Sequence, residues 1–161
     1  MFRKMRRNKQ LLSMEDTVAI LDRCTNGVLA CLGDDDYPYS VPLSYVYFNE
    51  KIYFHSAKTG HKIDAITKNP KVSFSVIDED TVVSEKFTTK FRSVIAFGKA
   101  RIVEGEERQE AMKSFVEKYS GNQPEEAKQK EIAGCSESYE VAIDVEHITG
   151  KEAIDYVRTL E

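Results

Sequence analysis

Apolar and polar residues alternate along most of the chain, and helical spacing replaces this alternation only in short segments. A period of two is typical of strands, whereas apolar residues at i, i+3 and i+4 are typical of helices. The segments that predict strands are 28–32, 39–48, 52–56, 71–77, 91–103 and 139–145. The segments that predict helices are 13–23, 62–68, 106–119 and 124–133.

Turn residues separate most of these strands. Segments 33–38 and 49–51 are rich in glycine, proline, asparagine and charged residues, which favours tight antiparallel connections. The polar segment 78–90 is interpreted as a loop, and Gly98 predicts a bulge or a close backbone approach inside the long strand. Because the helices are inserted singly, the order predicts an α+β protein with a six-stranded antiparallel barrel or sandwich and flanking helices. No repeat or internal linker divides the chain, so we expect one domain over 1–161.

The composition is that of a globular protein. The chain has 161 residues, of which 41% are hydrophobic and 31% are charged. No apolar run approaches the roughly 20 residues that a bilayer span needs, and the first residues lead into no signal-peptide core. We therefore expect a cytoplasmic protein without a membrane partner. Cys24, Cys31 and Cys135 lack C-x-x-C spacing and are expected to be small buried side chains.

Residues 1–12 form a basic N-terminal arm, with five basic and no acidic side chains in residues 1–10. The whole chain nevertheless has a net charge of −4, so the rest of it is acidic and repels phosphate backbones. No aromatic residue beyond Phe2 is available in the arm for base stacking. A nucleic-acid partner is therefore disfavoured, and we expect the arm to be solvated or to fold over an acidic surface of this protein or a partner.

The sequence lacks the motifs of the common enzyme classes: G-x-S-x-G, H-E-x-x-H, a Walker A loop, and G-x-G-x-x-G after a strand. His55, His61 and His147 are not spaced with acids or cysteines as metal ligands are, so no metal site is predicted. Any chemistry must therefore come from another kind of site.

The segment 55–62, His-Ser-Ala-Lys-Thr-Gly-His-Lys, is the strongest candidate for a binding site. It passes from a predicted strand into a predicted helix, where exposed amides and the helix dipole both favour an anion. Its hydroxyls, glycine and two lysines are suited to a phosphate. The alternative is an ordinary helix start with solvated lysines.

Two further features lie on predicted strands. Pro42 lacks a backbone N–H, so it either frees neighbouring groups for a ligand or marks an edge strand. Arg92, followed by Ser93 and Val94, places a guanidinium in an apolar neighbourhood, where it could pair with a carboxylate of the protein or with a ligand phosphate.

Taken in order, these pieces resemble the flavin-binding split barrels related to pyridoxamine 5′-phosphate oxidase, and more closely the branch of 5-nitroimidazole antibiotic resistance proteins. The matching segments cover most of the chain. They are 5–7, 27–30, 38–45, 52–57 with 60–62, 69–72, 93–95 with Gly98, and 148–151.

This resemblance implies a homodimer with FMN at its interface, and FAD is a variant that the same phosphate site could take. The residues that it implies along the isoalloxazine ring are Val41, Pro42, Leu43 and Ser44. Those that it implies at the ribityl phosphate are His55, Ser56, Ala57, Gly60 and Lys62. It also implies that Arg92, Ser93 and Val94 lie close to the flavin. His55 is the candidate for contact with a small-molecule substrate.

The resemblance leaves three kinds of function open. The first is an FMN-dependent oxidoreductase that reduces electron-poor compounds such as 5-nitroimidazoles, in which the flavin transfers the electrons and the protein supplies placement. The second is a flavin- or haem-binding module without turnover, with His55 or His61 as an axial ligand. The third is an activity related to pyridoxamine 5′-phosphate oxidase itself.

Overall fold

The computed structural model describes residues 1–134 and 138–158, and Cys135 lies outside them. The strands are β1 (Asn26–Leu32), β2 (Pro38–Ser44), β3 (Val46–Phe48), β4 (Lys51–Ala57), β5 (Lys71–Val83), β6 (Thr88–Val103) and β7 (Ser138–Glu152). The α-helices are α1 (Met14–Arg23), α2 (His61–Lys68), α3 (Gly105–Ser120), α4 (Glu125–Gly134) and α5 (Ile154–Arg158). Short 3-10 turns occupy Asn8–Gln10, Asp34–Asp36 and Ser84–Lys86.

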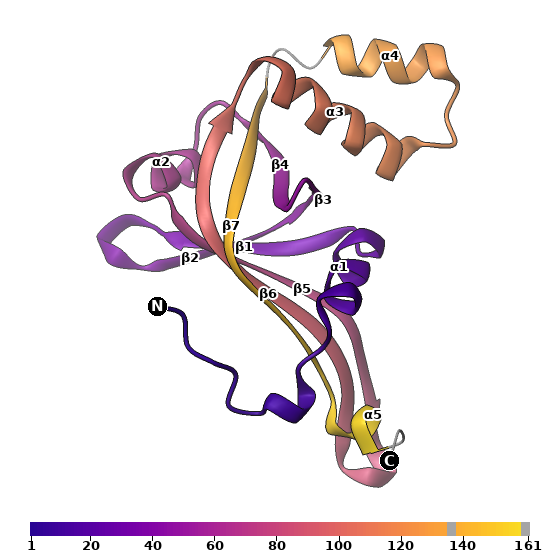
Figure 1. The fold of residues 1–161 in the computed structure, drawn as a ribbon. Coiled ribbons are helices and arrows are strands. Elements are labelled where there is room, and N and C mark those ends of the chain that lie inside the picture. Colours follow the sequence, from indigo (N-terminus) through magenta and orange to yellow (C-terminus); the bar gives the residue numbers. More distant parts are fainter. Residues whose placement is uncertain (135–137, 159–161) are drawn as a thin grey trace.

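The strands form one antiparallel sheet in the order β2-β1-β5-β6-β7-β4-β3. β2 and β3 lie at opposite ends of this order, although only Tyr45 separates them in the chain. The sheet must therefore curl until its two edges approach each other, which is consistent with a split barrel (Figure 1). The expectation of an antiparallel α+β fold is confirmed.

Tyr45 lies where the chain passes from one edge of the sheet to the other, and its hydrogen bonds fix this position. Its side chain is fully buried, and its hydroxyl donates to the carbonyl of Leu21 at 2.8 Å. The Tyr119 hydroxyl accepts from the Tyr45 amide at 3.0 Å and lies 2.8 Å from the Tyr45 carbonyl oxygen. A side chain of α3 thus accepts from the Tyr45 amide, which removes the cost of burying that amide unpaired, and its single proton lies within reach of the carbonyl oxygens of Thr25 and Tyr45.

The predicted number of six strands is wrong, because the described residues form seven. The expected strand 39–48 is divided at Tyr45 into β2 and β3. The expected loop 78–90 is also wrong: β5 continues to Val83 and β6 begins at Thr88. At this end of the hairpin, side chains on both faces of the strands are largely exposed, as Val82 is at 73%. With no buried face, the sequence here does not need to alternate apolar and polar residues. β7 likewise runs beyond the expected 145 to Glu152, and this extension pairs with residues 92–97 of β6.

Gly98 lies at the predicted irregularity. The register of β6 with β7 shifts between Phe97 and Gly98. A Cβ atom on Gly98 would lie 2.3 Å from the carbonyl oxygen of Asp144. The close backbone approach is therefore confirmed, and only glycine fits there without movement of β7.

Helices α1 and α3 cover the barrel from outside the sheet. α1 begins at Ser13, whose hydroxyl accepts from the Asp16 amide at 3.0 Å, and it buries Ile20 and Leu21. The helical face predicted for α3 is buried at Ala111, Met112, Phe115 and Val116. In Figure 1, α3 and α4 lie beyond one end of the barrel, while α5 and the β5–β6 turn lie at the other. None of the helices within the described residues is both long and apolar enough to cross a membrane.

Two of the three cysteines can be placed. Cys31 is buried, as expected, and Cys24 is half-buried with its thiol near Asp78, at 3.4 Å. Neither is in a disulfide. In the described part of the chain, no group of three histidine, cysteine or acidic side chains could hold a metal ion.

Candidate functional site

The junction of β4 and α2 places the predicted phosphate segment at the rim of the barrel. Gly60 caps α2 with φ of +122°, a conformation that L side chains rarely adopt. Its carbonyl oxygen accepts from the amides of Ile63 and Asp64. The amides of His61 and Lys62 find no acceptor among the described residues, as is usual in the first turn of a helix. The segment therefore offers open backbone donors.

The Lys62 ammonium lies beside these amides, near the buried Phe54 ring. Its Nζ atom lies 5.8 Å from the centre of the Phe54 ring. Burial lowers the pKa of Lys62, and no carboxylate in the described ranges lies within salt-bridge distance of it. Among the described residues, the chain thus supplies a half-buried cation without a counter-ion. This arrangement fits an anionic group better than it fits a solvated helix start, because an anion would restore a partner for the partly desolvated charge.

His61 connects α2 to the turn between β1 and β2 through a hydrogen bond. Its Nε2 atom accepts from the Asp34 amide at 3.3 Å, and its ring stacks on Tyr39 at 4.2 Å. A Cβ atom on Gly33 would lie 2.7 Å from this Nε2, so glycine is needed for the approach. His61 therefore positions the helix, and it also connects the phosphate segment to β2.

The His55 side chain lies against α3 and not in the barrel interior. Its ring meets Phe115 edge to face at 5.1 Å, while the rest of the side chain is exposed. Burial against α3 lowers the pKa of His55, and the Lys62 charge lowers it further. The imidazole is consequently neutral at pH 7. Ser56, the next residue, is buried and points to the other side of the strand, whereas Ala57 is exposed.

β2 contributes the second group of predicted residues. Pro42 and Ser44 are exposed on one side of this edge strand, and Val41 and Leu43 pack against the core on the other. The edge-strand interpretation of Pro42 is therefore confirmed. The Tyr39 ring stacks on His61, so β2 lies near the phosphate segment. Pro42 follows Tyr39 by three residues, about 10 Å along the same strand.

The sheet surface beside Pro42 is mainly apolar, and we call it the open face. One row of paired residues crosses it from Pro42 through Val28 and Ser75 to Ile95. Phe97 follows Ile95 on the same side of β6, and both side chains remain exposed, at 44% for Ile95 and 38% for Phe97. Small and branched side chains of this kind can lie against a planar ring system. Val28 and Ile95 lie in segments that carry the family resemblance, whereas the sequence motifs did not single out Ser75 or Phe97.

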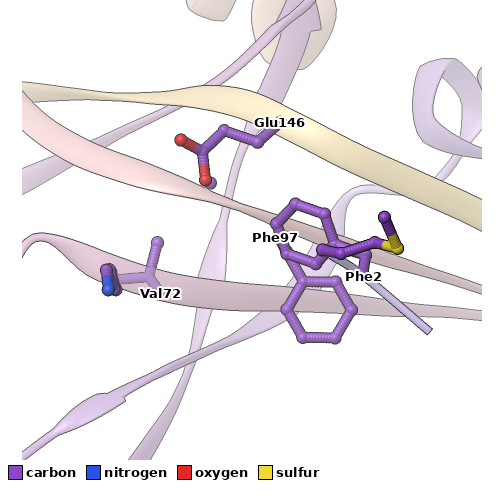
Figure 2. Close-up of a pocket in the computed structure, with 7 residues that line it drawn as sticks. Phe2, Val72, Phe97 and Glu146 are labelled. Carbon is purple, nitrogen blue, oxygen red and sulfur yellow. The ribbon is translucent and has the colours of Figure 1, made fainter.

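The N-terminal arm crosses the edge of the open face. Phe2 stacks on His147 at 5.0 Å and lies 5.4 Å from Phe97. Farther along the arm, Gln10 donates to the carbonyl of Glu152 at 2.8 Å. The arm therefore lies against its own protein through rings and backbone groups. A hollow of about 590 Å³ opens between them (Figure 2), and its lining residues are Met1, Phe2, Lys71, Val72, Phe97, Gly98 and Glu146.

The third predicted group is divided between the two sides of β6. Arg92 pairs with Glu152 at 3.4 Å and lies 4.2 Å above the Tyr156 ring, so it meets a carboxylate of the protein itself. Val94 is a core residue. Ser93 pairs with Ile77 next to the row of the open face and lies three strands from β2, roughly 14 Å away. The structure brings Ser93 toward the open face, but it turns Arg92 to a local ion pair.

A sequence model described as pyridoxamine 5′-phosphate oxidase matches residues 13–152. The chain belongs to this family. The matched range includes both the phosphate segment and the open face, and it leaves out most of the basic arm.

Solved structures of similar fold come from several bacteria. The conserved hypothetical protein Rv2991 of Mycobacterium tuberculosis has a TM-score of 0.80 and 23% identity, covering 98% of this chain and 92% of its own. A candidate 5-nitroimidazole antibiotic resistance protein of Bacteroides thetaiotaomicron has a TM-score of 0.73 and 20% identity, covering 88% and 86%. A FAD-binding protein of Mesorhizobium loti, mll6688, has a TM-score of 0.65 and 25% identity, covering 89% and 97%.

Proposed function

We propose that this protein binds a flavin nucleotide between two copies of the chain and uses it to reduce small electron-poor aromatic compounds. The observation that supports flavin binding is the presence of an anion site and of an exposed, mainly apolar sheet surface in one chain. Open amides and the Lys62 cation lie at the start of α2, the stacked rings of His61 and Tyr39 connect this helix to one side of β2, and Pro42 on the other side of the same strand borders the open face. A flavin has the corresponding two parts, a phosphate and a planar ring.

The residues of this chain have separate roles in the proposal. Gly60 and Lys62 hold the phosphate through backbone amides and a charge-assisted hydrogen bond, while Pro42 and Ser44 lie along the ring. A bound flavin supplies the hydride or electron transfer, and the protein supplies binding and electrostatics. His55, neutral at pH 7, offers a ring nitrogen that can donate or accept a proton beside the substrate. The flavin is FMN in this proposal, with FAD as the variant.

Family membership and one neighbour support the cofactor class. The Mesorhizobium loti protein, 25% identical, is described as binding FAD. The resemblance to a candidate nitroimidazole resistance protein suggests the substrate class, at 20% identity.

The absorption spectrum of the purified protein tests the proposal. We expect two flavin bands, and we expect the pigment released by denaturation to run as FMN on chromatography. Reduced protein mixed anaerobically with a 5-nitroimidazole should return to the oxidised spectrum. A Soret band would support a haem module instead, and a colourless protein that does not take up FMN or FAD would contradict flavin binding.

A further inference from the structure

The side chain of Glu140, on β7, is completely buried and finds no hydrogen-bond partner for either carboxylate oxygen. An unpaired carboxyl group in a protein interior is costly and is retained in few structures without a reason. Glu140 is also absent from every motif used to define the flavin site. The residues that surround this carboxyl group therefore indicate its role.

The register of the sheet places Glu140 directly opposite His55 on β4 and opposite Val103 on β6. Opposite residues of an antiparallel pair share a face, with Cβ atoms about 5 Å apart. Val103 and Ala142 are buried apolar neighbours, whereas His55 is exposed. On this face the exposed imidazole is thus the cross-strand neighbour of the buried carboxyl.

Phe115 places helix α3 against the same face, because its ring contacts that of His55. The Arg108 guanidinium lies close enough to lower the pKa of Glu140, but burial outweighs it and raises that pKa to about 7. Arg108 also donates to the Ser138 carbonyl at 3.2 Å. Thus α3 places one cation near Glu140 and covers this face with apolar side chains.

The other charged groups on this face are bonded to one another. Arg101 donates to both Glu107 and Asp144, and Glu107 accepts from the Tyr53 hydroxyl at 3.1 Å. On the other side of His55, the Lys62 cation disfavours an imidazolium. Glu140 and His55 take no part in these bonds.

We propose that Glu140 and His55 share one proton across the β4–β7 pair, so that Glu140 is a positioning residue that controls the protonation of His55. In one state the carboxyl holds the proton and the imidazole is neutral. In the other the proton has moved to a ring nitrogen, and a carboxylate faces an imidazolium. Rotation of the two side chains toward each other is sufficient, and no group outside the chain is needed. The use of this proton by a substrate rests on the proposed function, whereas the pairing itself does not.

Histidine side-chain NMR tests the pairing on the protein as purified, whether or not it contains flavin. His55→Gln assigns the His55 signal, and the titration is then followed in the native protein and in Glu140→Gln. Loss of an opposite charge at this distance should lower the His55 midpoint by about one pH unit. Glu146→Gln, the same change at an exposed position of β7, should leave it unchanged.

The reciprocal measurement does not depend on Glu140→Gln folding. Carboxyl signals of glutamate-labelled protein are titrated in the native chain and in His55→Gln, and the Glu140 midpoint should rise when the imidazole is removed, since coupled sites affect each other equally. Identical midpoints in both comparisons would overturn the proposal. A failure of flavin binding alone would overturn the proposed function and leave the proton pair intact.

Discussion

The Nζ atom of Lys62 lies 5.8 Å from the centre of the fully buried Phe54 ring. The ammonium is therefore held at the mouth of the barrel and not in bulk solvent, which is why its pKa is lowered. A half-buried cation gains more from an anionic partner than an exposed one does, because less water screens the pair. This relationship separates Lys62 from the other lysine of the same segment.

Lys62→Ala should weaken flavin binding about ten- to a hundredfold, the loss expected for one charge-assisted hydrogen bond. Quenching of flavin fluorescence on titration with apoprotein measures the dissociation constant. Lys58→Ala is the matched control, because Lys58 is exposed in the same loop. Equal losses in both variants would show that general positive charge, and not the position of Lys62, holds the phosphate.

His55→Ala should leave flavin affinity nearly unchanged and slow the reduction of a 5-nitroimidazole by about a hundredfold, a typical loss of general acid–base help. The reason is that the imidazole packs on Phe115 of α3. Stopped-flow absorbance of the reduced protein gives the rate. If His55→Ala loses flavin as severely as Lys62→Ala, the histidine belongs to the cofactor site and its catalytic assignment is wrong.

The local features of this chain could be predicted from the sequence. The buried face of α3 follows from the spacing of Ala111, Met112 and Phe115, and the β4–α2 junction follows from eight consecutive residues. In both, the interacting positions are close in the chain, so periodicity and turn chemistry are enough.

The features that could not be predicted depend on pairing between distant segments. Arg92 meets Glu152 because β6 and β7 share a register, and nothing near Arg92 indicates its partner. Glu140 comes opposite His55 in the same way, across 85 positions of sequence. The far end of the β5–β6 hairpin was missed for another reason: its strands are exposed on both faces, so burial leaves no pattern in them.

Phe97→Glu should convert a dimer into a monomer and weaken flavin binding with it. Phe97 and Ile95 leave apolar surface exposed on the open face, and exposed aromatic side chains of this kind are common at interfaces. Light scattering at micromolar concentration measures the mass. Ile102→Glu is the control, because Ile102 lies on the same strand at a matched 37% exposure and outside the open face. A native protein that is monomeric with flavin bound would contradict the proposed interface.

Glu140 should make the protein less stable as the pH rises from about 4.5 to about 7. The pKa of the folded group is about 7, against 4.5 when unfolded, so between these values the native state holds a proton that the unfolded state has lost. Stability contributed by the neutral carboxyl is complete below pH 4.5 and declines up to about pH 7, by roughly 3 kcal/mol at about 1.4 kcal/mol per pH unit.

Denaturant unfolding of the native chain and of Glu140→Gln, at pH 5 and at pH 8, isolates this contribution, because the other titrating groups are common to both. The amide keeps the shape of the carboxyl and cannot ionise, so the variant should be similar in stability at pH 5 and clearly more stable at pH 8. Glu146→Gln should follow the native chain at both values, since Glu146 is exposed on the same strand. Parallel curves for the native chain and Glu140→Gln would mean that Glu140 ionises freely, in contact with water or with a partner, and that the side chain is not held in an apolar enclosure under α3.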